Sequence, residues 1–292
     1  MESIVVAGKL NTRHFQRAKK CAEFLRASRL ATATVLALVP TDYETLVERL
    51  RKEMPNKKAL QHSGNTFCYL NAPVPRYVGN CRDLLDWAGA KFGYSDSSND
   101  MIYRGLAKLH MRSYMDKSRS SFVYIDLSVD GEAEESLTIE LFQSEAPNTC
   151  DNFRKLCEGV KDAATGEEWG YEGSEFHRIK KGGWVQGGDV VDGSGKNGKS
   201  ASLPDGAPIA DETYGLCFDK PGMLGMANTG PHTGQSQFFF TTRPLPWLDT
   251  TKVAFGRVIE GLRTLRVIER LPTENERPLK KVTIDRCGPY EL

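Results

Sequence analysis

The sequence of 292 residues predicts two modules, an α/β module followed by an all-β module. Strand and helix patterns alternate through roughly the first 95 residues. From Gly170 onward, short strands alternate with glycines and loops, which is typical of a β-barrel or sandwich. Residues 1–115 contain 18 Lys and Arg against 10 Asp and Glu, whereas residues 116–292 contain 21 against 28. Net charges of +8 and −7 indicate two modules with different partners.

The first module is expected to follow the order strand, helix, strand, helix, strand, strand, helix. Apolar and β-branched runs predict the strands, and apolar residues at helical spacing predict the helices. Thr41 and Glu44 form a capping-box pattern at the start of the second helix. The expected strands are residues 4–7, 32–39, 67–70 and 76–78, and the expected helices are residues 15–25, 41–50 and 83–92.

This order resembles a thioredoxin-like or glutaredoxin-like module. Redox chemistry on such a module needs a cysteine of low pKa at the N-terminus of the first helix, where the helix dipole stabilises the thiolate. Residues 11–14 of this chain read Asn-Thr-Arg-His at that turn, and Cys21 lies about two turns inside the helix. We therefore expect a scaffold or docking module without redox cysteines.

Polar breaks at residues 94–99 and 116–121 flank an amphipathic pattern over residues 101–115. They predict a first module at 1–94, a linker or docking helix at 95–120 and a second domain at 121–292. The basic first module suits an acidic protein surface, RNA or a phosphate-rich surface, or it is simply a solvated, lysine-rich face. Nucleic acid is the least favoured partner, because the module lacks a stacking aromatic platform.

The seven cysteines favour a reducing, cytoplasmic location, because their number is odd and no Cys-x-x-Cys pair occurs. The five histidines are scattered and do not pair with cysteines at ligand spacing, so neither a metal nor another cofactor is expected. The longest apolar runs extend for only a few residues, and the N-terminus does not match a secretory signal. No association with a membrane is predicted.

The second module begins with an expected hairpin of residues 122–129 and 137–142, and a helix is expected at 149–157. Residues 193–200, Gly-Ser-Gly-Lys-Asn-Gly-Lys-Ser, match the phosphate-binding P-loop pattern letter by letter. That pattern functions only when a helix follows it, whereas residues 201–208 contain two prolines and a glycine. We interpret the segment as a glycine-rich surface loop.

Two stretches carry motifs with a fixed order and spacing. Residues 176–189 read FHRIKKGGWVQGGD, and residues 222–256 contain GMLGMANTGP, SQFFFT, WLD and VAFG in that order. These motifs resemble the cyclophilin family of peptidyl-prolyl isomerases over residues 121–290, which implies an eight-stranded antiparallel barrel capped by helices. Residues 182–189 and 272–278 are similar to one branch, peptidyl-prolyl isomerase-like subtype six. Members of that branch have an N-terminal extension and are associated with motile cilia.

Rotation about an X–Pro bond crosses a barrier of about 18–20 kcal/mol, because the C–N bond loses its resonance. At the twisted transition state the proline nitrogen has a localised lone pair. A donor aimed at that nitrogen binds the transition state better than either planar state, and only such differential binding speeds the step. A guanidinium suits this role, and the resemblance implies that it belongs to Arg178.

The resemblance also implies how the peptide is bound. Apolar residues are expected to line a slot for the proline ring, polar groups to hold the peptide backbone, and Trp247 to lie on the rim and favour cyclosporin binding. The residues expected to line the slot are Trp184, Phe239 and Leu248, and those expected to hold the peptide are Gln186, Gln237 and the backbone of Asn228. Ala227, Trp247 and Lys252 complete the expected binding residues.

Two positions depart from the family pattern. Gly183 stands where an aromatic residue is usual, and Lys252 stands where a histidine is usual. Loss of a buried phenylalanine removes about 1.5–3 kcal/mol of apolar contact, so isomerase activity is expected to be weakened by about tenfold. Trp184 is larger than the methionine that is usual at its position. Its indole either fills the space left by the missing aromatic side chain at Gly183 or blocks the proline slot.

Two functions follow. The first is a cyclophilin-type isomerase of weakened activity that acts on X–Pro bonds in proteins and assists their folding or assembly. The alternative is a weak or inactive binding subunit of a ciliary axonemal assembly, joined through the basic N-terminal module. In both, the partner is a proline-containing protein segment, and the location is cytoplasmic or ciliary.

Overall fold

The computed structural model describes residues 2–54, 56–161 and 166–292. The chain divides into two compact units, one extending to Lys117 and including Leu292, and the other comprising Ser118–Glu291. The first unit is mixed α/β and the second is built on an antiparallel sheet, as the sequence predicts. Among the described residues, none of the helices combines the length and the apolarity needed to cross a bilayer.

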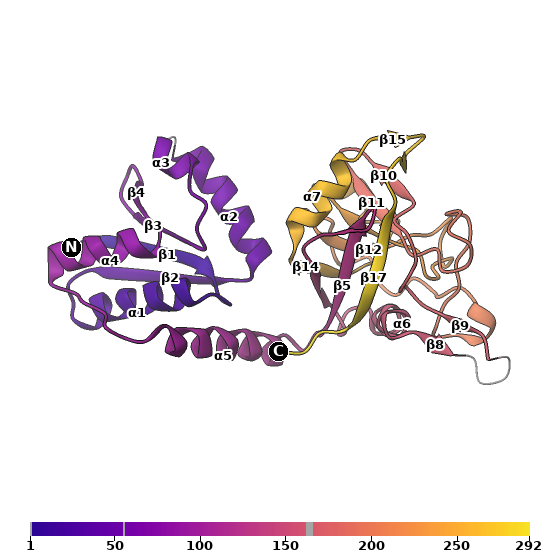
Figure 1. Ribbon diagram of the computed structural model, residues 1–292, viewed down its shortest axis with the longest axis horizontal. Helices are drawn as coiled ribbons and strands as arrows, with labels where there is room; N and C mark the ends of the chain where they lie inside the picture. The colour runs from indigo at the N-terminus through magenta and orange to yellow at the C-terminus, as the bar shows by residue number, and fades with distance from the viewer. Residues whose placement is uncertain (1, 55, 162–165) are drawn as a thin grey trace. The chain divides into compact units, whose positions relative to one another are not determined.

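The first unit contains a four-stranded sheet in the order β2-β1-β3-β4. β1 pairs parallel to β2 and antiparallel to β3, and β3 pairs antiparallel to β4. The central residues of β1 are buried, since helices α1 and α2 lie on opposite sides of the β1–β2 pair (Figure 1). These strands are β1 (Ser3–Lys9), β2 (Thr32–Leu38), β3 (Thr66–Leu70) and β4 (Arg76–Gly79).

The order of elements predicted for this unit is confirmed, with one additional short helix, α3. The helices are α1 (Arg13–Ala27), α2 (Pro40–Glu53), α3 (Lys57–Leu60), α4 (Cys81–Phe92) and α5 (Asp100–Ser118). Burial raises the pKa of Cys21 to about 12, so this thiol is protonated at neutral pH. The thioredoxin-like character of the unit stays a prediction.

Local sequence explains where these helices begin, with one correction. The Thr12 side chain accepts a hydrogen bond from the Phe15 amide at the start of α1, and Asn80 and Asp83 form a reciprocal capping box at the start of α4. The capping box predicted at Thr41 is wrong. Helix α2 starts one residue earlier at Pro40, whose fixed φ suits the first helical position.

Helix α5 belongs to the first unit and packs there through Tyr103, Ala107 and Met111, all of which are buried. The loop before it contributes Asp96, whose side chain is 2% exposed. Asp96 accepts hydrogen bonds from the Tyr103 hydroxyl at 2.8 Å and from Arg17 Nε at 2.9 Å. This carboxylate therefore ties the segment after α4 to both α1 and α5.

We expect Asp96→Asn to destabilise the first unit in a pH-dependent way. Burial acts to raise the pKa of Asp96, but hydrogen bonds from Tyr103, Ser98 and Lys20 outweigh burial and lower it. A carboxyl with a lowered pKa stabilises the fold above the unfolded pKa of about 4, and this contribution is lost as the pH falls through the folded value. The substitution should reduce the free energy of unfolding by about 2 kcal/mol at pH 7.

Urea denaturation at pH 7 and pH 3 measures this effect, with Asp86→Asn as the control because Asp86 is exposed. The loss should be smaller at pH 3. An equal loss at both pH values would mean that the Asp96 carboxylate does not supply the stabilisation.

The second unit is a curled antiparallel sheet in the order β10-β11-β13-β12-β14-β7-β5-β17, so the eight strands expected from the sequence are present. The two ends of this path are joined by residues 173–176, which precede β10. The Gly173 amide donates to the Ile284 carbonyl at 2.7 Å, and the Phe176 amide donates to the Val282 carbonyl at 3.0 Å. The strands are β5 (Ser121–Val129), β7 (Leu137–Leu141), β10 (Arg178–Lys180), β11 (Trp184–Gly187), β12 (Met223–Met226), β13 (Phe238–Thr241), β14 (Ala254–Glu260) and β17 (Val282–Pro289).

Two helices and several short elements complete this unit. The Glu212 carboxylate accepts the amides of Asn148 and Thr149 at 2.9 and 2.7 Å, which satisfies the positive N-terminus of the first of these helices. The elements are α6 (Pro147–Glu158), α7 (Leu262–Arg270), the 3₁₀ turns η1 (Pro204–Gly206) and η2 (Pro246–Leu248), and the short strands β6 (Glu132–Ala133), β8 (Val160–Lys161), β9 (Glu168–Trp169), β15 (Thr273–Glu274) and β16 (Arg277–Pro278).

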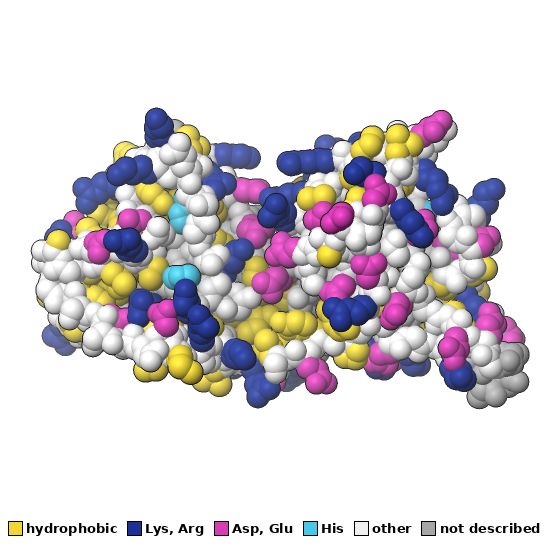
Figure 2. All heavy atoms as spheres, viewed as in Figure 1, with side chains coloured by type: hydrophobic (Ala, Val, Ile, Leu, Met, Phe, Trp, Pro, Cys, Tyr) yellow, Lys and Arg dark blue, Asp and Glu magenta, His cyan; other side chains and the backbone are white. Residues whose placement is uncertain are grey.

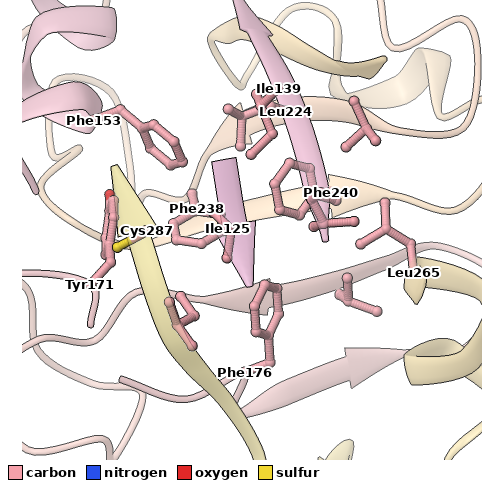
Figure 3. Close-up of a cluster of buried hydrophobic side chains, with 14 of the residues drawn as sticks. Ile125, Ile139, Phe153, Tyr171, Phe176, Leu224, Phe238, Phe240, Leu265 and Cys287 are labelled. Atoms are coloured by element: carbon pink, nitrogen blue, oxygen red, sulfur yellow. The ribbon is translucent and has the colours of Figure 1, made fainter. Parts of the chain in front are cut away.

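The core of the second unit is an aromatic cluster centred on Phe238 (Figure 3). The Phe238 ring lies 5.0–5.7 Å, centroid to centroid, from four other rings, and it is fully buried. These rings are Phe153, Tyr171, Phe176 and Phe240. Since Phe176 and Phe238 are close in sequence to Arg178 and Gln237, the cluster fixes the strands that present the polar site residues.

Charged side chains of both signs are interspersed over the visible face of each unit (Figure 2). In the first unit several basic residues have acidic partners, such as Lys9 with Glu44 at 2.8 Å and Arg17 with Asp96 at 2.9 Å. Part of the basic excess of this unit is therefore paired within the unit itself.

Candidate active site

Three neighbouring strands place the predicted residues on one face of the sheet. Arg178 on β10 lies opposite Gln186 on β11, and Gln186 lies opposite Phe239 on β13. Directly paired residues of antiparallel strands project to the same side. The register therefore brings the expected catalytic guanidinium, a peptide-holding amide and the expected floor of the proline slot into one row.

A groove with a volume of about 630 Å³ runs beside this row. It brings together Arg178, Gln186, Ala227, Asn228 and Gln237, which are distant in sequence. Its other walls come from residues 195–198 and from the loops around Pro208 and Thr229–Gln235. The groove thus collects the guanidinium and all the predicted peptide-holding groups.

Phe239 and the other predicted proline-slot residues are largely covered. Phe239 is 3% exposed and Leu248 is 8% exposed, and both belong to a buried cluster with Phe218. The half-buried Trp184 packs on that cluster, with its ring centroid 5.9 Å from that of Phe239. The Trp184 indole therefore lies over the floor of the slot. Trp247, by contrast, is 57% exposed.

A chain of hydrogen bonds holds the polar side of the groove. Trp184 Nε1 donates to Gln186 Oε1 at 3.3 Å, and Gln186 Nε2 donates to Gln237 Oε1 at 2.9 Å. Gln237 Nε2 then donates to the carbonyls of Gly195 and Asn197 at 3.1 and 2.7 Å. The two glutamines are thus oriented by the protein, and the last link fixes the glycine-rich loop as a groove wall.

This loop is the segment that matches the P-loop pattern, and its Gly195 amide is directed inward. The buried Asp189 carboxylate accepts the amides of Val191, Asp192 and Gly195 at 3.0, 3.3 and 2.7 Å. The residues that follow form bends and the 3₁₀ turn η1. The geometry confirms a surface loop, because its Gly195 amide binds a carboxylate of the protein and residues 201–208 form no α-helix.

Lys252 lies at the Asn228 end of the groove. Its ammonium donates to the Asn228 carbonyl at 3.0 Å and also to the Asn228 side-chain oxygen. Burial lowers the pKa of Lys252; Asp211 opposes this shift and Arg178 adds to it. Lys252 therefore engages the backbone of Asn228, which was expected to hold the peptide.

Sequence reasoning missed one residue that contacts Arg178. Glu276 Oε2 accepts from Arg178 Nε at 2.7 Å, and Glu276 Oε1 accepts from Lys180 Nζ at 2.6 Å. The guanidinium carbon of Arg178 also lies 5.5 Å from the centre of the Trp184 ring. Glu276 lies almost a hundred positions from Arg178 in sequence, so neither spacing nor periodicity could have linked the two residues.

The family model described as "Cyclophilin type peptidyl-prolyl cis-trans isomerase/CLD" matches residues 124–289, more than half of the chain. This chain belongs to the cyclophilin family. Its cyclophilin domain accounts for the second unit, and the predicted resemblance is confirmed.

Relatives of the chain extend over both units. Proteins of Bos taurus and Mus musculus, each named "Probable inactive peptidyl-prolyl cis-trans isomerase-like 6", are 33% identical to it. The alignments cover 98% and 97% of this chain and 92% and 90% of those proteins. "Peptidyl-prolyl cis-trans isomerase cyp11" of Rhizopus delemar is 44% identical over 58% of this chain and 50% of its own length. The relatives thus include one protein named as an isomerase and others named as probably inactive.

The cyclophilin domain lacks the usual aromatic side chain at Gly183, and the structure indicates what replaces it. A Cβ at Gly183 would lie 3.2 Å from Lys180 Cγ and 3.3 Å from the Lys180 carbonyl oxygen, so the turn leaves little room for a side chain. The indole of the neighbouring Trp184 lies against Phe239 in its place.

Replacing Trp184 by methionine, the residue usual in cyclophilins, should uncover Phe239 and raise kcat/KM for an Ala-Pro peptide by about tenfold. The gain comes from apolar surface that becomes available to the proline ring. A protease-coupled assay measures it, with Trp87→Phe in the first unit as the control. An unchanged or lower rate would show that the indole does not obstruct the slot.

Proposed function

We propose that the second unit binds proline-containing segments of proteins in the groove beside Arg178 and isomerises their X–Pro bonds slowly. One observation supports this most strongly: Arg178 lines the same groove as Gln186, Asn228 and Gln237. The family provides the reaction, and the groove provides the guanidinium and the peptide-holding groups together.

The mechanism follows from what each group can donate. Gln186 lines the groove and is oriented by Gln237, and its amide nitrogen has a second N–H that can hold a carbonyl of the peptide while the bond turns. Arg178 has its Nε engaged by Glu276, which leaves its terminal nitrogens to donate to the proline nitrogen. Such a donor binds the localised lone pair of the twisted state better than it binds either planar state.

Two contacts support a low rate. The proline ring must displace or share the surface that Trp184 occupies on Phe239, and the peptide must share the Asn228 carbonyl with Lys252. The name "Probable inactive" borne by relatives of similar length agrees with a weakened enzyme. We therefore expect an isomerase rate above the uncatalysed rate and below that of a cyclophilin whose proline slot is open.

A protease-coupled assay of the full-length chain on an Ala-Pro peptide tests this proposal. The rate should exceed the uncatalysed rate and should fall on addition of cyclosporin, which the exposed Trp247 is expected to contact. A rate equal to that of the peptide alone, over a wide range of protein concentration, would contradict it.

A second candidate is binding without useful turnover, and the cover that Trp184 forms over Phe239 favours it. In that role the groove holds a proline-containing loop of an assembly, and the basic first unit supplies a further contact. The predicted cytoplasmic, ciliary or axonemal location suits this role and is part of the proposal. Equal capture of an immobilised proline-rich peptide by wild type and Arg178→Ala, without any isomerase rate, would favour binding over catalysis.

Imaging of the tagged full-length chain in a cell with motile cilia tests the location. Signal along the cilium is expected, and its exclusion from the cilium would contradict this part of the proposal.

A further inference from the structure

The contact between Glu276 and Arg178 is built into a tight turn. Asn275 and Glu276 form the two central residues of the hairpin between β15 and β16, with φ values of +48° and +68°. Positive φ at both positions is the pattern of a type I′ turn, which favours asparagine or glycine. Asn275 fits that preference, whereas a glutamate at φ +68° is disfavoured.

The backbone also fixes where the Glu276 carboxylate lies. The Ile179 amide donates to the Glu276 carbonyl at 2.7 Å, which anchors the turn to β10 beside Arg178. The carboxylate then bridges Arg178 Nε at 2.7 Å and Lys180 Nζ at 2.6 Å. A residue unsuited to its backbone position thus makes two charged contacts, one of them with the proposed catalytic guanidinium.

This contact changes what Arg178 can do. A charge-assisted hydrogen bond from Nε restricts the guanidinium to the hairpin side, and the nearby negative charge offsets part of its positive potential. The interaction is present before the peptide binds, and the guanidinium must strain it to reach the prolyl nitrogen. The pair therefore stabilises the resting state more than the transition state, which lowers the rate.

We propose that Glu276 restrains Arg178 and thereby lowers the isomerase rate of this protein. The inference rests on the proposed function, because it assumes that Arg178 acts on the prolyl nitrogen. Glu276 is a positioning residue that acts through Arg178 without touching the peptide. Its side chain is 31% exposed and that of Arg178 is 42% exposed, so the ion pair is only partly shielded from water and its effect on the rate is moderate.

The test compares three full-length variants with the wild type. Glu276→Gly removes the carboxylate and suits the positive φ, and Glu276→Gln removes the charge while keeping the shape. Glu274→Gln is the matched control, because it removes a carboxylate from the same hairpin. The isomerase rate is measured by exchange spectroscopy of an Ala-Pro peptide, and the Arg178 Nε–H group is followed by ¹⁵N-resolved NMR.

The expected result is a rise in kcat/KM of about fivefold for Glu276→Gly and a smaller rise for Glu276→Gln, with no change for Glu274→Gln. The rise should appear in kcat more than in KM, and Arg178 Nε–H should exchange faster with water. Adding Arg178→Ala to Glu276→Gly should abolish the gain. A merely structural role of Glu276 would not produce a gain that depends on Arg178.

Each other outcome decides the question. If wild-type activity depends on Arg178 but Glu276→Gly is no faster, the restraint is refuted and the proposed function stands. If the wild type is at background and Glu276→Gly gains an Arg178-dependent rate, the restraint stands and the claim of residual wild-type activity fails. If no variant exceeds background, both are refuted.

Discussion

Arg178→Ala is expected to lower kcat/KM for an Ala-Pro peptide by about 10²-fold. If the wild type accelerates isomerisation by less than about 10²-fold, the variant should show only the uncatalysed rate. Loss of one oriented donor from a catalytic site costs about 2.7–4 kcal/mol of transition-state stabilisation. Arg178 is the residue that lines the groove beside Gln186 and Gln237 and can direct a charged donor at the prolyl nitrogen. Steady-state assays on the full-length variant measure the loss.

Arg178→Lys provides the matched control. Lysine keeps the charge but loses the planar set of donors, so it should restore only a small part of the rate. Full activity in Arg178→Ala would show that the salt bridge with Glu276 is the only function of this arginine.

Phe238→Ala is expected to destabilise the second unit by about 3–5 kcal/mol. Phe238 is fully buried and contacts four other rings at 5.0–5.7 Å, so its removal leaves a cavity that these rings cannot fill without moving (Figure 3). For a unit of this size the loss lowers the melting temperature by about 10 °C.

Differential scanning calorimetry of the full-length chain measures the effect of Phe238→Ala, with Val191→Ala as the control because Val191 is 56% exposed. The transition of the first unit should be unaffected. A destabilisation below about 1 kcal/mol would mean that the aromatic cluster relaxes around the missing ring.

Most of the architecture was predictable from local pattern. Alternating residues at 122–129 and 137–142 predicted the β5–β7 hairpin, and the pairing of Val123 with Ile139 confirms it. The resemblance to cyclophilins, carried by short motifs, implied that Arg178, Gln186 and Phe239 belong to one site, and the strand register brings them into one row. The capping box at Thr41 failed because Pro40 fits the first helical turn and shifts the start of α2.

The contacts that regulate the groove were not predictable in the same way. Whether Trp184 would fill or cover the slot depends on the packing of Phe218, Phe239 and Leu248, which come from separate segments. The contact between Lys252 and Asn228, and that between Glu276 and Arg178, join residues that only the closed sheet brings together. Such tertiary contacts leave no periodic signature in the sequence.

Exchange spectroscopy of an Ala-Pro peptide with catalytic amounts of the full-length wild-type chain tests whether the groove beside Arg178 isomerises X–Pro bonds. We expect cis–trans exchange faster than in the peptide alone, together with shifts of the side-chain amide resonances of Gln186 and Gln237 as the peptide is added. Exchange at the rate of the free peptide, with both amide resonances unmoved, would contradict it.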